Sequence, residues 1–168
     1  AAHRAHASTS GVARYLPAVA GFLMEKEIEY LSRTLTNPER PMAAIVGGAK
    51  VSDKLAMMEF LIDKVDVVLV GGGMVSTFLH AKGLPIGASL VEPEMIDVAR
   101  GLETKAGDGG IVFLLPPDLV VAERFDANAP SATVEVGDTP NGWVIMDIGP
   151  QARQRYAQEI KRCRTVLW

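Results

Sequence analysis

The 168-residue sequence contains one cysteine, few aromatic residues and no long apolar run. Cys163 has no second cysteine to pair with, so a disulfide within the chain is impossible and a reducing, cytoplasmic compartment is expected. No apolar stretch approaches the roughly 20 residues that cross a bilayer. The net charge of −3 lacks the basic excess of a general nucleic-acid surface. We therefore expect neither a membrane nor a nucleic acid as a partner.

The residues that are abundant indicate an α/β protein. Hydrophobic residues make up 48 % of the chain while aromatic residues make up only 6 %, a composition typical of buried parallel strands packed on helices. Short apolar runs predict strands at 42–46, 65–70, 111–115, 118–125, 143–149 and 165–168, of which 118–125 is expected at a sheet edge. Helical spacing predicts helices at 16–35, 50–65, 74–83, 92–107 and 151–163.

This alternation predicts a doubly wound, mainly parallel sheet with helices on both faces, a Rossmann-like three-layer architecture. The chain begins abruptly and ends on an apolar strand, which would bury poorly alone. We therefore expect a fold that is incomplete at both ends.

A glycine junction in the sequence IVGGAKVSDK, residues 45–54, is the strongest local signal. A buried strand there passes through two glycines into a helix, and such a junction presents backbone N–H groups and a positive helix end to an anion. Lys50 and Lys54 are four residues apart and would share one face of the helix start. The alternative is an ordinary strand–helix turn with two solvated lysines. The segment is not a Walker A loop.

A second glycine turn, VGGGMVST at residues 70–77, follows the next strand. Glycines there would let a flat group such as adenine approach the backbone, although close helix–sheet packing is an equally simple explanation. In a parallel sheet both turns fall on the carboxyl edge, where ligands bind in such folds. The pair is therefore more informative than either turn alone.

Two polar clusters complete the candidate sites. His3, Arg4 and His6 suit a phosphate or carboxylate ligand, or form a solvated loop; no further metal ligands lie nearby in the sequence, and no metal site is predicted. Asp147 ends a strand just before Pro150. An acid at that position suits a metal or a ribose as well as a helix cap, and we interpret it as the cap of the helix that follows.

These segments, in this order, resemble phosphoglycerate kinase. The matching stretches are AHRAHAS (2–8), LPAVAGFLMEKE (16–27), GGAKVSDK (47–54), VDVVLVGGGM (65–74), SLVE (89–92), GW-x-x-x-DIGP (142–150) and TVLW (165–168). The resemblance implies a remnant of a substrate-binding domain at 1–15, an interdomain helix at 16–35, and a nucleotide-binding domain at 36–168 that is truncated at its C-terminus.

The resemblance also implies an activity. It is a glycolytic transfer of a phosphoryl group between 1,3-bisphosphoglycerate and ADP, giving 3-phosphoglycerate and ATP, with Mg²⁺ accompanying the nucleotide. The aspartate that helps to place the metal in the family lies in a later segment that this chain lacks. The parent enzyme is expected to be a monomer, whereas this chain alone is expected to bind nucleotide weakly, to be inactive and to self-associate through uncovered faces.

Roles are implied residue by residue. Arg4 matches an arginine that holds the substrate phosphate, with His3 and His6 as its neighbours. Lys54 matches a lysine that contacts the nucleotide phosphates, and Lys50 matches the catalytic lysine that follows the transferred group. The positions that match the adenosine site are Gly48, Gly72, Gly73, Ile145 and Met146. The last two depart from the glycine–leucine pair that relatives often carry, which leaves their contact with adenine open.

Two other functions are compatible with the α/β rhythm. A dinucleotide-dependent oxidoreductase is one, although the sequence lacks GxGxxG and the acid about 20 residues beyond it. A non-catalytic nucleotide-sensing or scaffold domain is the other, favoured only by the short length. Tight NADH binding would support the first, and a natural gene limited to these residues would support the second.

Overall fold

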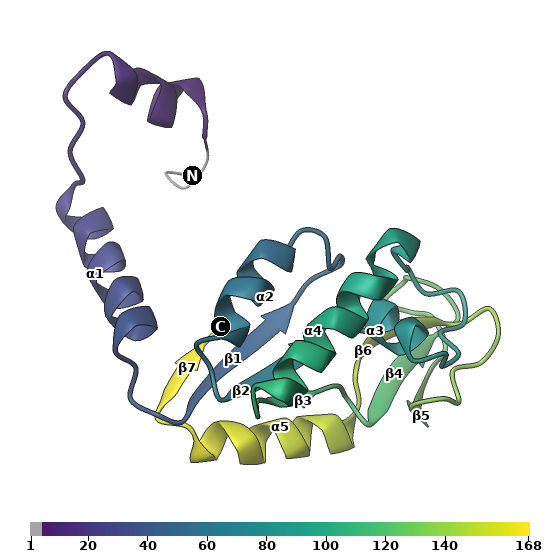
Figure 1. Cartoon of the computed structure of the whole chain (residues 1–168). Helices are drawn as coiled ribbons and strands as arrows, with labels where there is room; N and C mark the ends of the chain where they lie inside the picture. Colours follow the sequence, from purple (N-terminus) through teal and green to yellow (C-terminus); the bar gives the residue numbers. More distant parts are fainter. Residues whose placement is uncertain (1–4) are drawn as a thin grey trace. The chain divides into compact units, whose positions relative to one another are not determined.

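The structure, a computed structural model, describes residues 5–168 and divides into two units, Ala1–Asn37 and Pro38–Trp168. The described part of the first unit contains one π-helical turn, Ala7–Gly11, one 3₁₀ turn, Val12–Arg14, and helix α1, Phe22–Thr36 (Figure 1). The predicted helix at 16–35 therefore begins six residues late. Gly21 is extended and forms the N-cap, and a glycine inside a helix costs about 1 kcal/mol relative to alanine. No residue of α1 is buried.

A four-stranded parallel sheet forms the centre of the second unit, with strand order β3-β2-β1-β7. The strands are β1 (Met42–Gly47), β2 (Val67–Gly71), β3 (Val112–Leu114) and β7 (Thr165–Leu167). Each corresponds to a predicted strand. The register pairs Gly47 with Gly71, so the two glycine turns begin side by side at the carboxyl edge.

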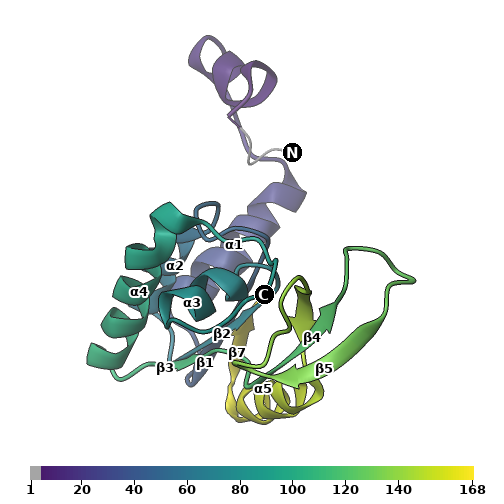
Figure 2. The ribbon, with the colours of Figure 1, turned by 90° about the vertical axis from the view of Figure 1, so that its right-hand side faces the viewer.

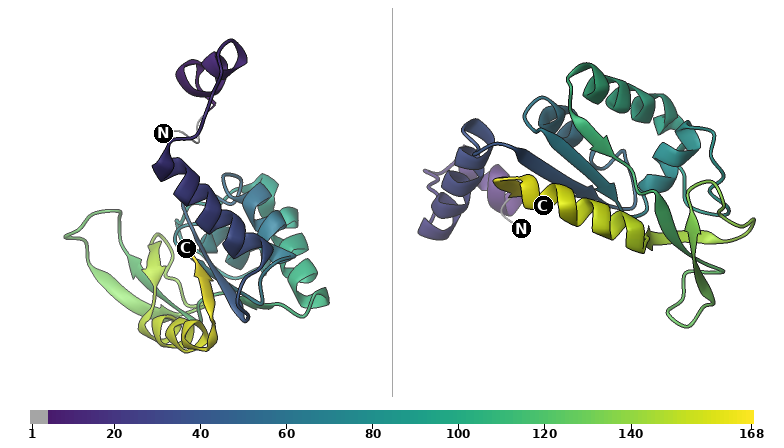
Figure 3. Two further views of the ribbon diagram at one scale, coloured as in Figure 1. Left: turned by 90° about the vertical axis from the view of Figure 1, so that its left-hand side faces the viewer. Right: turned by 90° about the horizontal axis from the view of Figure 1, so that it is seen from below.

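Helices cover both faces of this sheet (Figures 1 and 3). Helices α2 (Leu55–Ile62), α3 (Val75–Ala81) and α4 (Ile96–Asp108), with a 3₁₀ turn at Pro93–Met95, lie on one face, and α5 (Pro150–Arg162) lies on the other. Alternate strand residues face opposite layers. Ala43, Leu69 and Leu114 pack with Tyr156 of α5. On the other face, the rings of Phe78 and Phe113 lie 5.5 Å apart.

A second, antiparallel sheet follows directly after β3, with strand order β5-β4-β6 (Figure 2). Its strands are β4 (Asp118–Ala122), β5 (Ser131–Glu135) and β6 (Val144–Ile148). The prediction of an edge strand at 118–125 is wrong, because β4 pairs with strands on both sides. Pro116 and Pro117 cannot donate to a ladder, so the chain leaves the parallel sheet there. The mainly parallel α/β fold with two helical layers is confirmed.

None of the helices in residues 5–168 is both long and apolar enough to cross a membrane.

Candidate functional site

The two glycine turns touch each other at the carboxyl edge of the parallel sheet. The N–H of Met74 donates to the carbonyl of Gly48 over 2.8 Å. Gly72 has a φ of +69°, and a Cβ atom there would lie 3.0 Å from both the backbone nitrogen and the carbonyl oxygen of Gly48. A larger residue at position 72 would therefore be strained and would push the turns apart.

The two lysines of the first turn flank a short irregular segment and do not share a helical face. Helix α2 begins at Leu55, five residues later than predicted, because its ladder starts with the N–H of Met58 donating to the carbonyl of Lys54 over 2.8 Å. The prediction that Lys50 and Lys54 lie one turn apart on a helix is wrong. Lys50 is exposed and Lys54 is half-buried.

Lys54 lies across the glycine edge. A Cβ atom at Gly48 would meet the Cε atom of Lys54 at 3.6 Å, so the lysine stem packs over the bare backbone of that turn. Within residues 5–168, neither Lys50 nor Lys54 forms an ion pair. Two unpaired cations beside an edge of exposed backbone are suited to an anionic ligand.

A buried carboxylate holds the segment between the lysines. Glu92 accepts the N–H of Val51 over 2.6 Å, the N–H of Ser52 over 3.1 Å, and the hydroxyl of Ser52. The prediction that the N–H groups of this junction are free for a ligand is wrong for these two residues, because Glu92 accepts both. The role of Glu92 was not predicted from SLVE, because a second acid, Glu94, lies two residues away and the N–H partners of Glu92 lie 41 and 40 residues away in the sequence.

A second buried carboxylate caps helix α5. Asp118 accepts the N–H of Gln151 over 2.9 Å and that of Ala152 over 2.7 Å, and it is fully buried. The prediction that Asp147 caps this helix is wrong, because the Asp147 carboxylate is exposed and accepts the N–H of its neighbour Ile148. A Cβ atom at Gly71 would lie 3.8 Å from Ile148, so the end of β6 adjoins the second glycine turn.

The sequence model of the family described as phosphoglycerate kinase matches residues 1–168. This chain belongs to the phosphoglycerate kinase family. The phosphoglycerate kinase of Chloroflexus aurantiacus is 54 % identical over 167 residues, which are 99 % of this chain and 42 % of that protein. That of Moorella thermoacetica is 53 % identical over 168 residues, 100 % of this chain and 43 % of its own length.

Solved structures of the phosphoglycerate kinase family agree. The enzyme from Coxiella burnetii matches with a TM-score of 0.89 and 42 % identity, covering 100 % of this chain and 43 % of that chain. The enzyme from Pyrococcus horikoshii matches with a TM-score of 0.77 and 28 % identity, covering 98 % of this chain and 42 % of that chain. This chain therefore spans less than half the length of the phosphoglycerate kinases that it matches.

Of the residues that the family resemblance links to adenosine, Gly48 lies in the first glycine turn, Gly72 and Gly73 lie in the second, and two more lie on β6. Ile145 is almost fully buried, and its N–H donates to the Ser89 hydroxyl over 2.8 Å. Met146, the next residue along β6, is half-buried. The residues linked to the substrate belong to the first unit: His6 is exposed before the π-helical turn, whereas His3 and Arg4 lie outside the described residues.

The described part of the chain contains no group of side chains that could bind a metal ion. Within residues 5–168, no three His, Cys, Asp or Glu side chains are grouped so that they could hold an ion. Of the carboxylates nearest the lysine turn, Glu92 is fully engaged by N–H and O–H donors. The described residues therefore do not form a ligand set that fits a resident Mg²⁺.

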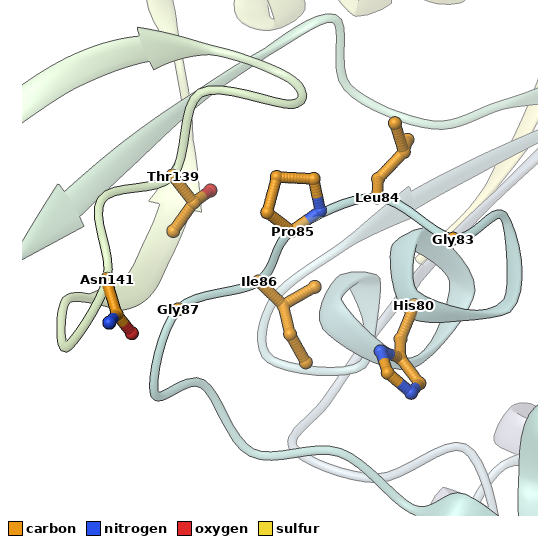
Figure 4. Close-up of a pocket in the computed structure, with 8 residues that line it drawn as sticks. All are labelled: His80, Gly83, Leu84, Pro85, Ile86, Gly87, Thr139 and Asn141. Carbon is orange, nitrogen blue, oxygen red and sulfur yellow. The ribbon is translucent and has the colours of Figure 1, made fainter.

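A separate cavity of about 510 Å³ opens between the loop after α3 and the loop before β6 (Figure 4). The residues that line it are His80, Gly83, Leu84, Pro85, Ile86, Gly87, Thr139 and Asn141. This lining contains neither lysine nor arginine, so it does not suit a polyphosphate. The glycine edge with its two lysines is the better candidate for a nucleotide.

Proposed function

We propose that the unit Pro38–Trp168 binds the phosphates of ADP or ATP over the paired glycine turns. We further propose that it does so as part of a phosphoglycerate kinase, which transfers a phosphoryl group between 1,3-bisphosphoglycerate and ADP. The observation that carries this proposal is the packing of the Lys54 stem on Gly48, where the two turns meet. This contact places a cation beside backbone that is free of side chains, at the edge where α/β folds bind ligands.

Each group has a separate task in the proposed site. The Lys54 ammonium binds the nucleotide phosphates, and Lys50, which is exposed and unpaired in the described part, neutralises charge on the phosphoryl group as it moves. Adenosine lies against Gly72 and Gly73, with Met146 offering apolar surface. Ile145 is too buried to offer much surface, so we assign it to supporting Met146.

The substrate side of the reaction is proposed from the family alone. Arg4 would hold the glycerate phosphate, with His3 and His6 beside it, in a remnant of the substrate-binding domain at 1–15. Residues 16–35 would form the interdomain connection, and 36–168 most of the nucleotide-binding domain. The reaction is glycolytic, and we place it in the cytoplasm with a monomeric parent enzyme.

The isolated chain is proposed to bind nucleotide weakly and to lack turnover. It matches 42 % of the curated relative from Chloroflexus aurantiacus, and phosphoryl transfer needs both substrates enclosed by closing domains. We also expect it to self-associate, because large apolar side chains of the second unit, such as Phe125 and Trp168, are almost fully exposed.

The test is a titration of the ¹⁵N-labelled chain with Mg-ADP, followed by amide shifts and calorimetry. We expect shifts confined to residues around Gly48, Lys54 and Gly72. Lys54→Gln should weaken binding about tenfold or more, because a charge-assisted hydrogen bond contributes roughly 1.5–3 kcal/mol. The control is Lys161→Gln, an exposed lysine on α5, which should leave the affinity unchanged.

Two outcomes would count against the proposal. Shifts around His80 and Asn141 with none at Gly48 would move the site to the other cavity. Equal affinities of the Lys54→Gln and Lys161→Gln variants would show that the nucleotide does not use Lys54.

A coupled assay for ATP formation tests the proposed inactivity of the isolated chain. We expect no turnover, and rapid turnover would contradict the proposed inactivity.

A further inference from the structure

The turn that carries both lysines already contains an anion from its own chain. The Glu92 carboxylate takes two successive backbone N–H groups, those of Val51 and Ser52, and the Ser52 hydroxyl. Such a pair of N–H groups at the entry to a helix is the usual binding site for a ligand anion. Here the internal carboxylate occupies it, so a bound phosphate cannot use these two donors.

Glu92 is fixed from its other side as well. Its N–H donates to the hydroxyl of Thr77 in α3 over 3.3 Å, and the Ser76 hydroxyl contacts the carbonyls of both Gly73 and Leu90. Helix α3 begins directly after the second glycine turn. Glu92 therefore ties the lysine turn of β1 to the element that follows the glycine turn of β2.

The carboxylate is charged under ordinary conditions. Burial raises the pKa of Glu92, but the hydrogen bonds from Ser52 and Val51 and the nearby charge of Lys50 together outweigh burial, and the pKa lies below the usual 4.5. Glu92 is only 6 % exposed, and a buried charge without partners would be strongly destabilising. Its three donors and the cation of Lys50 offset that cost.

We propose that Glu92 is a positioning residue of the nucleotide site, which fixes the turn between Lys50 and Lys54 and leaves phosphate binding to their two ammonium groups. This inference rests on the proposed nucleotide binding. By filling the backbone donors, Glu92 holds Val51 and Ser52 in one conformation whether or not a ligand is bound. The two lysines then project from a rigid segment, which lowers the conformational entropy that binding must remove.

The experiment compares Glu92→Gln with the matched control Glu94→Gln, an exposed glutamate two residues away. Glutamine has the same shape but no charge, so its carbonyl oxygen accepts the two N–H bonds more weakly than the single carboxylate oxygen that takes both in the wild type. In the Glu92→Gln variant we expect the amide protons of Val51 and Ser52 to move upfield and the Mg-ADP dissociation constant to rise about tenfold. Glu94→Gln should change neither, and Glu92→Asp, which restores the charge, should recover most of the affinity.

A pH titration tests whether the Glu92 carboxylate holds the two N–H groups before any ligand binds. In the wild type without nucleotide, the Val51 and Ser52 amide shifts should stay constant from pH 8 to 5 and change together only below about pH 4.5, as Glu92 takes up a proton. The Glu92→Gln variant should show no such joint change. Because no nucleotide is present, this titration reports on the turn alone.

The outcomes distinguish this inference from the proposed function. Unchanged Mg-ADP affinity in Glu92→Gln, with Val51 and Ser52 shifted, would overturn the positioning role while nucleotide binding stands. Absence of Mg-ADP binding in the wild type, with the joint amide titration present, would overturn the proposed function instead. If Glu92→Gln does not fold, Ser52→Ala removes one of the three donors, and unchanged Val51 shift and affinity there would also overturn the positioning role.

Discussion

The backbone of Gly149 lies so close to the Asp118 carboxyl group that no side chain fits at position 149. A Cβ atom at position 149 would lie 2.2 Å from the Cγ and Oδ2 atoms of the Asp118 carboxyl group. The backbone of Gly149 is extended, with φ of −79° and ψ of 178°, so other residues could adopt this conformation. The requirement for glycine here comes from close approach and not from a left-handed φ. The buried carboxylate can reach the start of α5 only because this side chain is missing.

Gly149→Ala should therefore lower the free energy of unfolding by about 1–3 kcal/mol, the usual cost of overpacking a tight interior. Urea unfolding followed by circular dichroism would measure it. Gly101→Ala is the matched control, because Gly101 lies in α4 with nothing within 4 Å of the added Cβ, and the helix should gain up to about 1 kcal/mol. Equal stability of the two variants would contradict the contact.

At the scale of the element, helix α5 depends on a cap supplied by another strand. Its N-cap residue, Gly149, has no side chain, and Pro150 needs no N–H partner. The next two N–H groups, of Gln151 and Ala152, go to Asp118 at the start of β4. A carboxylate at this end also interacts favourably with the helix dipole. The cap thus links the antiparallel sheet to the helix under the parallel one.

Asp118→Asn should lower the free energy of unfolding by about 1–2 kcal/mol, because the amide can accept only one of the two bonds. The destabilisation should be local at first: the substitution should speed amide hydrogen exchange more at residues 151–154 than in strand β2. Asp126→Asn is the control, since Asp126 accepts the N–H of Asn128 at an exposed turn and should change stability by less than about 0.5 kcal/mol. Uniform acceleration of exchange across the unit would argue against a capping role.

At the scale of the whole molecule, Tyr156 joins α5 to two strands of the parallel sheet. Its hydroxyl lies 2.7 Å from the carbonyl of Val70 and 3.0 Å from that of Leu114, at the ends of β2 and β3. Burial raises the pKa of Tyr156 well above its usual 10.0, with a smaller opposing effect from Arg155. The hydroxyl therefore stays protonated and links α5 to the ends of the two strands near the glycine turns.

Tyr156→Phe should cost about 1 kcal/mol of unfolding free energy between pH 7 and 9. Above pH 10 the unfolded wild-type chain loses the phenol proton while the folded chain keeps it, so the stability of the wild type falls as the pH rises. The Tyr156→Phe variant has no phenol proton to lose, so the difference in unfolding free energy between the wild type and this variant should become smaller as the pH rises. Tyr30→Phe, at an exposed position of α1, should have no effect. A difference that stays constant to pH 11 would contradict the raised pKa.

The order of residues along the chain was enough to predict the α/β class, the strands of the parallel sheet, both glycine turns and the two lysines beside them. These features are local: strand and helix periodicity, and glycine at a strand end, are written in neighbouring residues. The family followed from the same segments. Helix ends were less well predicted. Helix α2, for example, begins at Leu55, because the N–H groups of Val51 and Ser52 before it donate to Glu92.

The carboxylates that hold the site could be found only in the folded chain. Glu92 is 41 residues from Val51, and Asp118 is 34 residues from Ala152, so each pair meets only when the layers pack. The central place of β4 was decided in the same way, because a strand's neighbours depend on pairing with distant segments. Local patterns fix which elements form, whereas buried polar groups find their partners through the fold as a whole.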